Sequence, residues 1–274
     1  MSPLSLVLVI ASAVSLLAWV LSLLTHDHSW VDRLWSVVPV VYVWVFAAST
    51  GLSDARLTVM AVVVTLWGAR LTYNFARKGG YTGAEDYRWA ILRARMPRWR
   101  FELFNLFFIV LYQNALLVLI TLPAWTAWEH RATPFGPPDV VAAALFVALL
   151  AGETVADEQQ WRFQLAKKTR DAAGPRFVQT GLWRYSRHPN FFFEQAQWWV
   201  FFLFGAIAAG SPLQWTVLGA ALLTLLFVGS TAFTESITRG RYPEYAAYQA
   251  TTSPIVPWPP RRRDVAAAAG PGRG

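Results

Sequence analysis

Residues 3–24 read PLSLVLVIASAVSLLAWVLSLL, an apolar run without a charged side chain. A helix needs about 20 such residues to cross a bilayer, so this run is long enough. Six more apolar stretches follow, and the sequence predicts spans at 3–24, 35–52, 56–76, 102–128, 138–160, 190–210 and 213–234. The span at 35–52 has the weakest support, because Pro39 lies inside it. We therefore expect an all-α, polytopic integral membrane protein with about seven transmembrane helices.

The composition points to the same class. Of the 274 residues, 55% are apolar and 15% are charged, and the mean hydropathy is +0.34. A soluble domain usually carries about 25% charged residues. The chain has no cysteine, which excludes a disulfide scaffold, thiol catalysis, a thiolate metal site and a cysteine-linked lipid anchor. The composition therefore disfavours both a soluble enzyme and a disordered chain.

The basic residues are distributed unevenly between the expected loops. Seven lie between spans three and four, seven between spans five and six, and six after the last span, out of 24 in all. Seven spans place these three segments on one side, which the positive-inside rule predicts to be cytoplasmic, with the N-terminus outside. The net charge of +8 then reflects membrane topology. The lipid bilayer is the expected partner, and nucleic acid is not expected.

No internal repeat and no second soluble domain stand out. We expect a single membrane domain over residues 1–260, followed by a disordered, Ala/Gly-rich tail over residues 261–274. Metal binding is not expected, because no two histidines have helical i, i+4 spacing, and His26 and His28 flank Asp27 in a short loop.

Several polar groups interrupt the apolar spans. They are Arg70 with Tyr73 and Asn74 in span three, Gln113 and Asn114 in span four, Glu153 and Asp157 in span five, Asn190 and Glu194 in span six, and Glu235 at the end of span seven. Ionisable groups at membrane depth are costly and often functional. Spacings of three and four residues place partners on one helix face. We expect a polar ligand site toward the cytoplasmic side, with structural interhelical ion pairs as the alternative.

Two C-terminal segments carry a family resemblance: GLWRYSRHPNFFFE at 181–194 and RYPEYAAYQATTSPIVPWPP at 241–260. Supporting segments are SWVDRLWSVVP at 29–39, GARLTYNFAR at 68–77, EDYRW at 85–89 and GETVADEQQWRF at 152–163. Together they resemble the steroid 5-alpha-reductase superfamily, in a bacterial branch often labelled only as a domain of unknown function. The resemblance covers most of the chain from about residue 29 and is most typical over about 140–260.

The resemblance implies a seven-helix reductase of the bacterial inner membrane that uses NADPH to reduce an activated carbon–carbon double bond in a steroid-like or isoprenoid lipid. Carried over by position, the residues implied for cofactor binding are Arg70, Glu153, Asp157, Arg176, Arg187, His188, Asn190, Glu194, Tyr245 and Tyr248. Asn190 and Glu194 match the nicotinamide end, Asp157 the adenosine part and Arg176 a phosphate. The residue types suit these roles, because arginine binds phosphate and an amide with a carboxylate can hold a carboxamide.

The implied catalytic residues are Asp32, Tyr73 and Glu194. Enone reduction needs a donor that stabilises the growing charge on the carbonyl oxygen. Steroid-reducing members place Gln-Glu before a proline on the second helix, whereas Val37 and Val38 precede Pro39 here. Asp32 is the acidic residue nearest to this position, and Tyr73 and Tyr87 are alternative donors. The competing interpretation is that Asp32 and Arg33 only begin a helix at the membrane interface. A steroid 4-ene-3-ketone substrate is therefore not expected.

Two other functions compete with this one. Isoprenylcysteine-type membrane methyltransferases also carry an Arg-His-Pro segment and a Y-x-x-Y ending, and they use S-adenosylmethionine. The N-terminal segments around Asp32, Arg70 and residues 85–88 match the reductase branch better. A non-enzymatic lipid-binding membrane protein is the third possibility.

Overall fold

The computed structural model describes residues 1–83, 85–169 and 174–261. These residues form helices, and apart from one isolated bridge between Ser186 and Ser253 they contain no β-structure. Six of their helical segments are long and apolar enough to cross a membrane: Pro3–Thr25, Ala55–Arg77, Arg98–Glu129, Pro137–Thr169, Pro189–Ala209 and Val217–Arg241. The prediction of an all-α, multi-pass membrane protein is confirmed. The expected tail falls outside the described residues except for Arg261.

The expected span at 35–52 is the one that differs. There the chain forms two short helices, α2 (Trp30–Leu34) and α3 (Val38–Ala48). Pro39 lies in the first turn of α3. Proline has no amide hydrogen and is tolerated only where a helix begins, so α2 and α3 are separate. The 11 residues of α3 rise about 16 Å, roughly half of a bilayer's hydrocarbon core. The structure thus has six helices of spanning length among its described residues.

The chain divides into two compact units. Unit 1 contains Met1–Leu150 and Gln195–Leu226, and unit 2 contains Ala151–Glu194 and Phe227–Gly274. Three helices contribute residues to both units: α9 (Pro137–Thr169), α10 (Pro189–Ala209) and α11 (Val217–Arg241). The other helices of unit 1 are α1 (Pro3–Thr25), α4 (Ala55–Arg77), α5 (Tyr87–Arg95), α6 (Arg98–Phe104), the π-helix η1 (Asn105–Tyr112), α7 (Gln113–Thr121) and α8 (Pro123–Glu129). Unit 2 also holds η2 (Gly181–Arg184) and α12 (Tyr245–Thr251).

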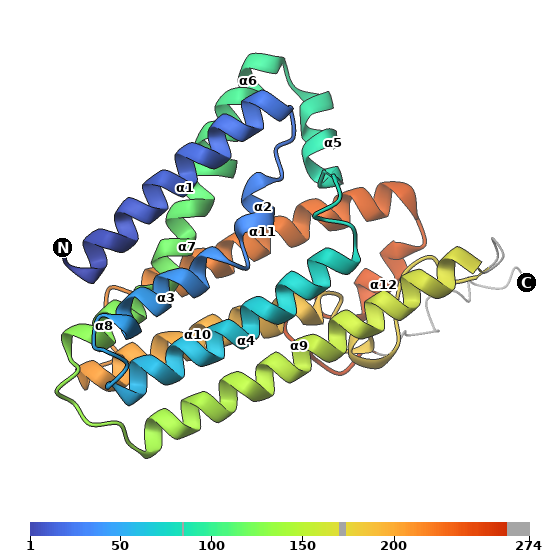
Figure 1. Ribbon diagram of the computed structural model, residues 1–274. Helices are drawn as coiled ribbons and strands as arrows, with labels where there is room; N and C mark the ends of the chain where they lie inside the picture. The colour runs from blue at the N-terminus through green and yellow to red at the C-terminus, as the bar shows by residue number, and fades with distance from the viewer. Residues whose placement is uncertain (84, 170–173, 262–274) are drawn as a thin grey trace, which may run out of the picture. The chain divides into compact units, whose positions relative to one another are not determined.

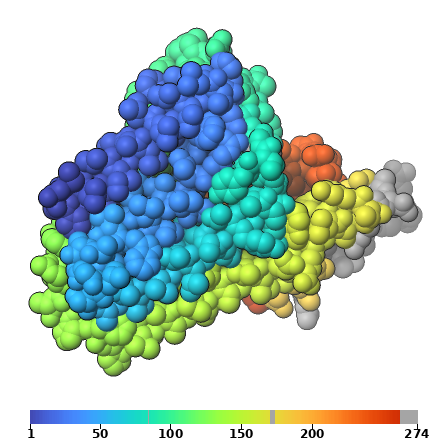
Figure 2. Space-filling model, viewed as in Figure 1, coloured from blue at the N-terminus to red at the C-terminus, as the bar shows by residue number. Residues whose placement is uncertain are grey.

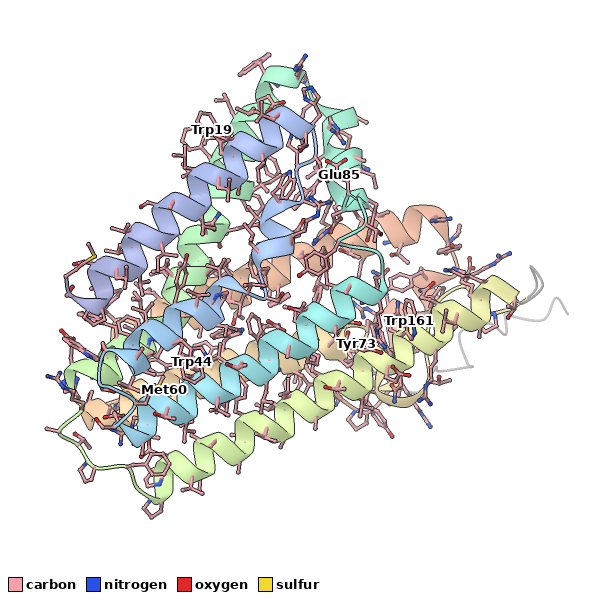
Figure 3. The ribbon with its side chains drawn as sticks, viewed as in Figure 1. Trp19, Trp44, Met60, Tyr73, Glu85 and Trp161 are labelled. Atoms are coloured by element: carbon pink, nitrogen blue, oxygen red, sulfur yellow. The ribbon has the colours of Figure 1, made fainter. Side chains whose placement is uncertain are left out.

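In unit 1, α3 and α4 run side by side (Figure 1). Trp44 on α3 is labelled in Figure 3. Its indole Nε1 donates to Thr65 Oγ1 on α4 at 2.8 Å. Apolar side chains of both helices, such as Phe46 and Met60, are fully buried. By contrast, α1 lies on the surface of unit 1 along its length (Figure 2). Only 17% of the residues in its most apolar stretch are buried. An apolar helix with so much exposed surface is suited to contact lipid.

A buried ion pair joins the first turns of α4 and α9 within unit 1. Arg56 donates through Nε to Asp139 Oδ1 at 2.6 Å and through Nη2 to Oδ2 at 2.9 Å. The same guanidinium donates to the carbonyls of Thr133 and Pro134, both at 3.0 Å. Arg56 is 2% exposed and Asp139 is fully buried. The two helices therefore begin at the same end of unit 1, and Arg56 is a paired interior group.

Candidate functional site

Glu235, near the end of α11, is the centre of a buried hydrogen-bond network in unit 2. Arg187 donates to it through both Nε and Nη2, at 2.6 Å to Oε1 and 2.9 Å to Oε2. His188 Nε2 lies 3.1 Å from Oε1, the Tyr245 hydroxyl donates to Oε1 at 3.2 Å, and Gln249 Nε2 donates to Oε2 at 2.8 Å. Four side chains from two segments, the Arg187-His188 pair and α12, thus share one carboxylate, which is largely satisfied without solvent.

The same arginine ties the Arg-His-Pro-Asn segment to the C-terminal end of the chain. Arg187 Nη1 donates to the carbonyl oxygens of Gln249, at 3.1 Å, and Thr252. The backbone N–H of Arg187 donates to the carbonyl of Ser253 at 2.8 Å, and Ser186 Oγ donates to the carbonyl of Ile255 at 2.6 Å. All three guanidinium nitrogens of Arg187 therefore already have acceptors. In this arrangement Arg187 and His188 fix the first turn of α10.

The two tyrosines of the Y-x-x-Y ending are also buried in unit 2. Tyr245 binds Glu235, and the Tyr248 hydroxyl donates to the carbonyl of Trp183. The ring of Phe177 packs against both, with centroids 4.9 Å and 5.7 Å away. Burial raises the pKa of both tyrosines, and the Glu235 carboxylate raises the pKa of Tyr245 further. Both phenols stay protonated and act as hydrogen-bond donors within the network.

Close packing between α9 and α10 brings their polar residues into one region of unit 2. A Cβ on Gly152 of α9 would lie 2.4 Å from the ring of Phe193 on α10, so only glycine allows this approach. Glu153, which follows Gly152, is 3% exposed, and Glu194, which follows Phe193, is 5% exposed. Asp157, one turn after Glu153 on α9, is also buried. Three carboxylates are therefore held away from water around this contact.

Asn190 lies in the first turn of α10, one helical turn before Glu194. Its side-chain carbonyl oxygen is buried and accepts no hydrogen bond from the described residues. A buried acceptor without a donor is costly and calls for a partner. The arrangement thus offers an unused amide acceptor with a carboxylate one turn away on the same helix face.

The loop that precedes this helix is attached to α9. The Trp183 indole donates to the carbonyl of Ala156 at 3.1 Å, and the Leu182 N–H donates to Gln159 Oε1 at 2.9 Å. Arg176, earlier in the loop, is exposed; its carbonyl accepts a hydrogen bond from Lys167 Nζ at 2.7 Å. Its guanidinium makes no hydrogen bond with the described part of the chain, so it is open to an anionic ligand.

Of the expected site residues, Asp32, Arg70 and Tyr73 belong to unit 1. Asp32 is partly buried and accepts a hydrogen bond from Trp89 Nε1 at 3.0 Å. Burial, helped by the Asp86 carboxylate, raises the pKa of Asp32 above its usual range. Tyr73 is 65% exposed, and the Arg77 guanidinium lies 5.3 Å from its ring centre. Asp32 therefore has the more sheltered environment of the two expected donors.

The EDYRW segment, residues 85–89, connects the residues just before α2 with α5 through hydrogen bonds. Glu85, labelled in Figure 3, accepts from the His28 N–H at 3.2 Å and from Arg93, and lies 3.1 Å from His28 Nδ1. Asp86 is bonded to Arg88 at 2.7 Å. The described residues contain no group of three or more His, Cys, Asp or Glu side chains placed to hold a metal ion.

Within unit 2 the structure thus gathers seven of the twelve expected residues into three sets. Arg187, His188 and Tyr245 meet at Glu235, while Asn190 with Glu194, and Glu153 with Asp157, occupy faces of α10 and α9. Sequence reasoning noted Glu235 only as a polar residue at the end of a span and did not consider Gln249. The sequence did contain a signal for this network: Glu235 stands at the end of the last span, and the basic pair Arg187-His188 stands just before the span at 190–210.

Fold and site together define a multi-pass helical membrane protein with a carboxylate-centred polar network in unit 2. The chain belongs to the family described as "Protein of unknown function (DUF1295)", which matches residues 18–252. An uncharacterized protein of the yeast Schizosaccharomyces pombe is similar, at 40% identity over 252 residues, covering 84% of this chain and 73% of the yeast protein. No solved structure matches.

Proposed function

We propose that this protein is a membrane reductase that binds NADPH and reduces an activated carbon–carbon double bond of a steroid-like or isoprenoid lipid. The resemblance of its Arg-His-Pro-Asn and Y-x-x-Y segments to the steroid 5-alpha-reductase superfamily supports the proposal. The observation that carries it is the unused, buried carbonyl oxygen of Asn190 beside Glu194. When bound, NADPH supplies the hydride.

The chemistry of this pair fits the amide end of a nicotinamide. A carboxamide has an N–H₂ group, which donates, and a carbonyl, which accepts. Asn190 Oδ1 can accept from that N–H₂ and its own N–H₂ can donate to the carbonyl, while Glu194 adds a second acceptor. The network around Glu235 fixes the start of α10, so it would hold both side chains in position.

Two further roles follow from the same proposal. Arg176, exposed and without an acceptor for its guanidinium among the described residues, would bind a cofactor phosphate, while Asp157, Glu153 and Arg70 would contribute polar contacts to the cofactor. Asp32 is the proposed proton donor to the substrate, because a carboxyl group with a raised pKa is protonated closer to neutral pH. Tyr73 is the alternative donor.

We further propose that residues 35–52, which include α3, cross the membrane as a seventh segment, with the N-terminus outside and the C-terminus cytoplasmic. Contacts within unit 1 support this. The Arg33 guanidinium before α3 donates to the carbonyl of Gly80, which follows α4. Ser49 and Asp54, after α3, line a pocket with Arg131, at the opposite end of α4. The proposed location is a cell membrane, the inner membrane in a bacterium.

The test is a titration of detergent-purified variants with NADPH, followed by the fluorescence of the dihydronicotinamide. We expect Asn190→Ala to weaken binding roughly tenfold, the effect of one hydrogen bond of about 1–1.5 kcal/mol. Asn114→Ala is the matched control, because Asn114 in unit 1 is also a buried amide with an unused carbonyl oxygen. Arg176→Ala should weaken NADPH binding and reduce the preference for NADPH over NADH.

Glu194→Gln separates binding from folding, because it keeps the shape and removes the charge. If Glu194 orients the cofactor, the folded variant should bind NADPH more weakly at nearly normal yield. Loss of yield with unchanged NADPH affinity in the surviving protein would make Glu194 a structural ion-pair partner. Together with wild-type affinity in Asn190→Ala, that result would remove the pair from the site.

A further inference from the structure

The C-terminal strap, residues 252–261, is held firmly although it lies after the last helix. The N–H of Trp258 donates to the carbonyl of Tyr185 at 2.9 Å, and the N–H of Arg261 donates to the carbonyl of Thr251 at 2.8 Å. The Ser186 hydroxyl donates to the carbonyl of Ile255 at 2.6 Å. Backbone hydrogen bonds on both sides therefore give the strap one conformation within unit 2.

This fixed strap presents apolar side chains to the outside. Trp258 is 67% exposed, Val256 is 59% exposed and the neighbouring Tyr185 is 42% exposed. Large apolar side chains that are exposed together usually mark an interaction surface. Tryptophan and tyrosine in particular are enriched where protein meets the membrane–water interface.

A polar pocket of about 520 Å³ opens beside these side chains. Its walls include Arg187, Thr251, Thr252, Ser253 and Arg261, and none of its described lining residues is acidic. The charge of Arg187 is matched by Glu235, whereas the Arg261 guanidinium makes no hydrogen bond or ion pair with the described residues. The pocket therefore combines one unmatched positive charge with several hydroxyl groups, which suits a phosphate.

The position of the pocket along the last span is set by its own contacts. Arg187 and Gln249, two lining residues, both bind Glu235, which lies six residues before Arg241 ends α11. Six residues of helix rise about 9 Å, so the pocket lies near the level where this apolar helix ends. That level is where lipid headgroups are found if α11 crosses the bilayer.

We propose that the strap and its pocket bind an anionic phospholipid. Arg261 binds the headgroup phosphate, with hydroxyls of the 251–253 segment as further donors, and Trp258 and Val256 rest against the headgroup and upper acyl region. In the sequence, Arg261 is the first of three consecutive arginines, Arg261 to Arg263. A basic segment next to an interfacial apolar surface is the combination that favours anionic lipid. This site is independent of the NADPH proposal.

The experiment titrates the full-length, detergent-purified protein with fluorescently labelled phosphatidylglycerol and, in parallel, with the same label on phosphatidylcholine. We expect a preference for phosphatidylglycerol, and Arg261→Gln should reduce it about fivefold, the effect of one interfacial arginine worth about 1 kcal/mol. Arg241→Gln is the matched control, because it removes the same charge from an exposed site outside the pocket. Trp258→Ala should weaken binding of both lipids and leave the preference unchanged.

Three results would overturn the proposal. The first is equal affinity of the unmodified protein for the two lipids. The second is an equal loss of preference in Arg241→Gln and Arg261→Gln, because that would indicate general charge attraction and no site. The third is displacement of phosphatidylglycerol by millimolar inorganic phosphate or by NADPH, which would assign the pocket to a soluble phosphate compound. Retention of the lipid under both competitors supports the membrane source.

Discussion

Glu235 illustrates how this chain holds a charge near the end of an apolar helix. A buried carboxylate is stable only when it is paired and its remaining lone pairs accept hydrogen bonds. The bidentate Arg187 supplies the pairing, and His188, Tyr245 and Gln249 supply the other donors. Because Arg187 and His188 directly precede α10 and the other two partners lie on α12, Glu235 connects α11 to α12 and to the start of α10 within unit 2.

Arg56 and Asp139 give the first prediction at the residue scale. Arg56→Ala should lower the free energy of unfolding by about 3–5 kcal/mol, because it leaves the Asp139 carboxylate buried without its partner. The measurement is the thermal unfolding midpoint in detergent. Arg131→Ala is the control, since Arg131 is exposed and donates only to the carbonyl of Trp128 among the described residues.

The double variant Arg56→Met, Asp139→Leu checks the reasoning behind that prediction. Removing both charges should recover part of the stability lost by Arg56→Ala, because no unpaired charge then stays buried. If Arg56→Ala is no less stable than Arg131→Ala, the pair contributes nothing and the account of this end of unit 1 is wrong.

Asp32 gives a prediction about pH. Its pKa is raised in the folded protein above the usual 3.8. The folded state therefore binds more protons than the unfolded state between pH 3.8 and the raised pKa, and stability falls as the pH rises through this range. Asp32→Asn removes this dependence and keeps an oxygen to accept from Trp89. The variant should thus gain stability relative to the unmodified protein as the pH rises from about 4 toward 7.

The readout for Asp32 is the thermal midpoint of both proteins across that pH range in the same detergent. The difference between them should grow with pH and then level off once the carboxyl group is ionised. A difference that does not change with pH would show that Asp32 ionises in the folded state as easily as in the unfolded chain.

Among the helices, close approach at glycine decides how α11 packs on α7 in unit 1. A Cβ on Gly219 would lie 2.3 Å from the carbonyl oxygen of Leu119, which is backbone and cannot move aside easily. Small residues allow such contacts between membrane helices. We expect Gly219→Ala to destabilise the protein by about 1–3 kcal/mol, the usual effect of overpacking.

Gly229 on the same helix is the control for that substitution. An added Cβ there meets nothing within 4 Å, so Gly229→Ala should leave the thermal midpoint unchanged or slightly raised. Equal effects of the two substitutions would mean that α11 does not pack on α7 as described.

Helices of spanning length were largely predictable from the sequence, because each depends on a local run of apolar residues. The runs that begin at residues 3, 56, 102, 138, 190 and 213 all correspond to long helices. The expected span at 35–52 instead gave the 11-residue α3. The sequence marks Pro39 as a helix start, but hydropathy averaged over a window does not register the break.

The polar contacts were less predictable, because they depend on residues far apart in the chain. Arg187 and Glu235 are separated by 48 positions, and Arg56 and Asp139 by 83. Residue type identified Glu235 as a polar group in an apolar span, but it did not identify the partner of any of these side chains. Charge counting likewise gives no partner for Arg56, whereas the structure pairs it with Asp139.

For the whole molecule, the charge asymmetry leads to a topology that is simple to test, because the chain has no cysteine of its own. Single cysteines at Ser53 and Thr82, both exposed, would report on the two ends of α4. In intact cells a membrane-impermeant maleimide should label Ser53→Cys and should label Thr82→Cys only after the cells are opened. The reverse pattern would invert the proposed orientation.

A fluorescent protein fused after Arg263 completes that topology test. If residues 35–52 cross the membrane, the two termini lie on opposite sides, so this fusion should fluoresce while an N-terminal tag is accessible from outside. Both termini on the same side would mean six crossings and would remove α3 from the spanning segments.

The central claim is that the protein binds NADPH, and one measurement tests it most directly. Detergent-purified protein is titrated in parallel with NADPH, NADH and S-adenosylmethionine, and binding is followed by equilibrium dialysis. The account predicts saturable binding of NADPH, weaker binding of NADH and no saturable binding of S-adenosylmethionine. Saturable binding of S-adenosylmethionine without NADPH would indicate a membrane methyltransferase, and binding of none of the three would contradict the reductase proposal altogether.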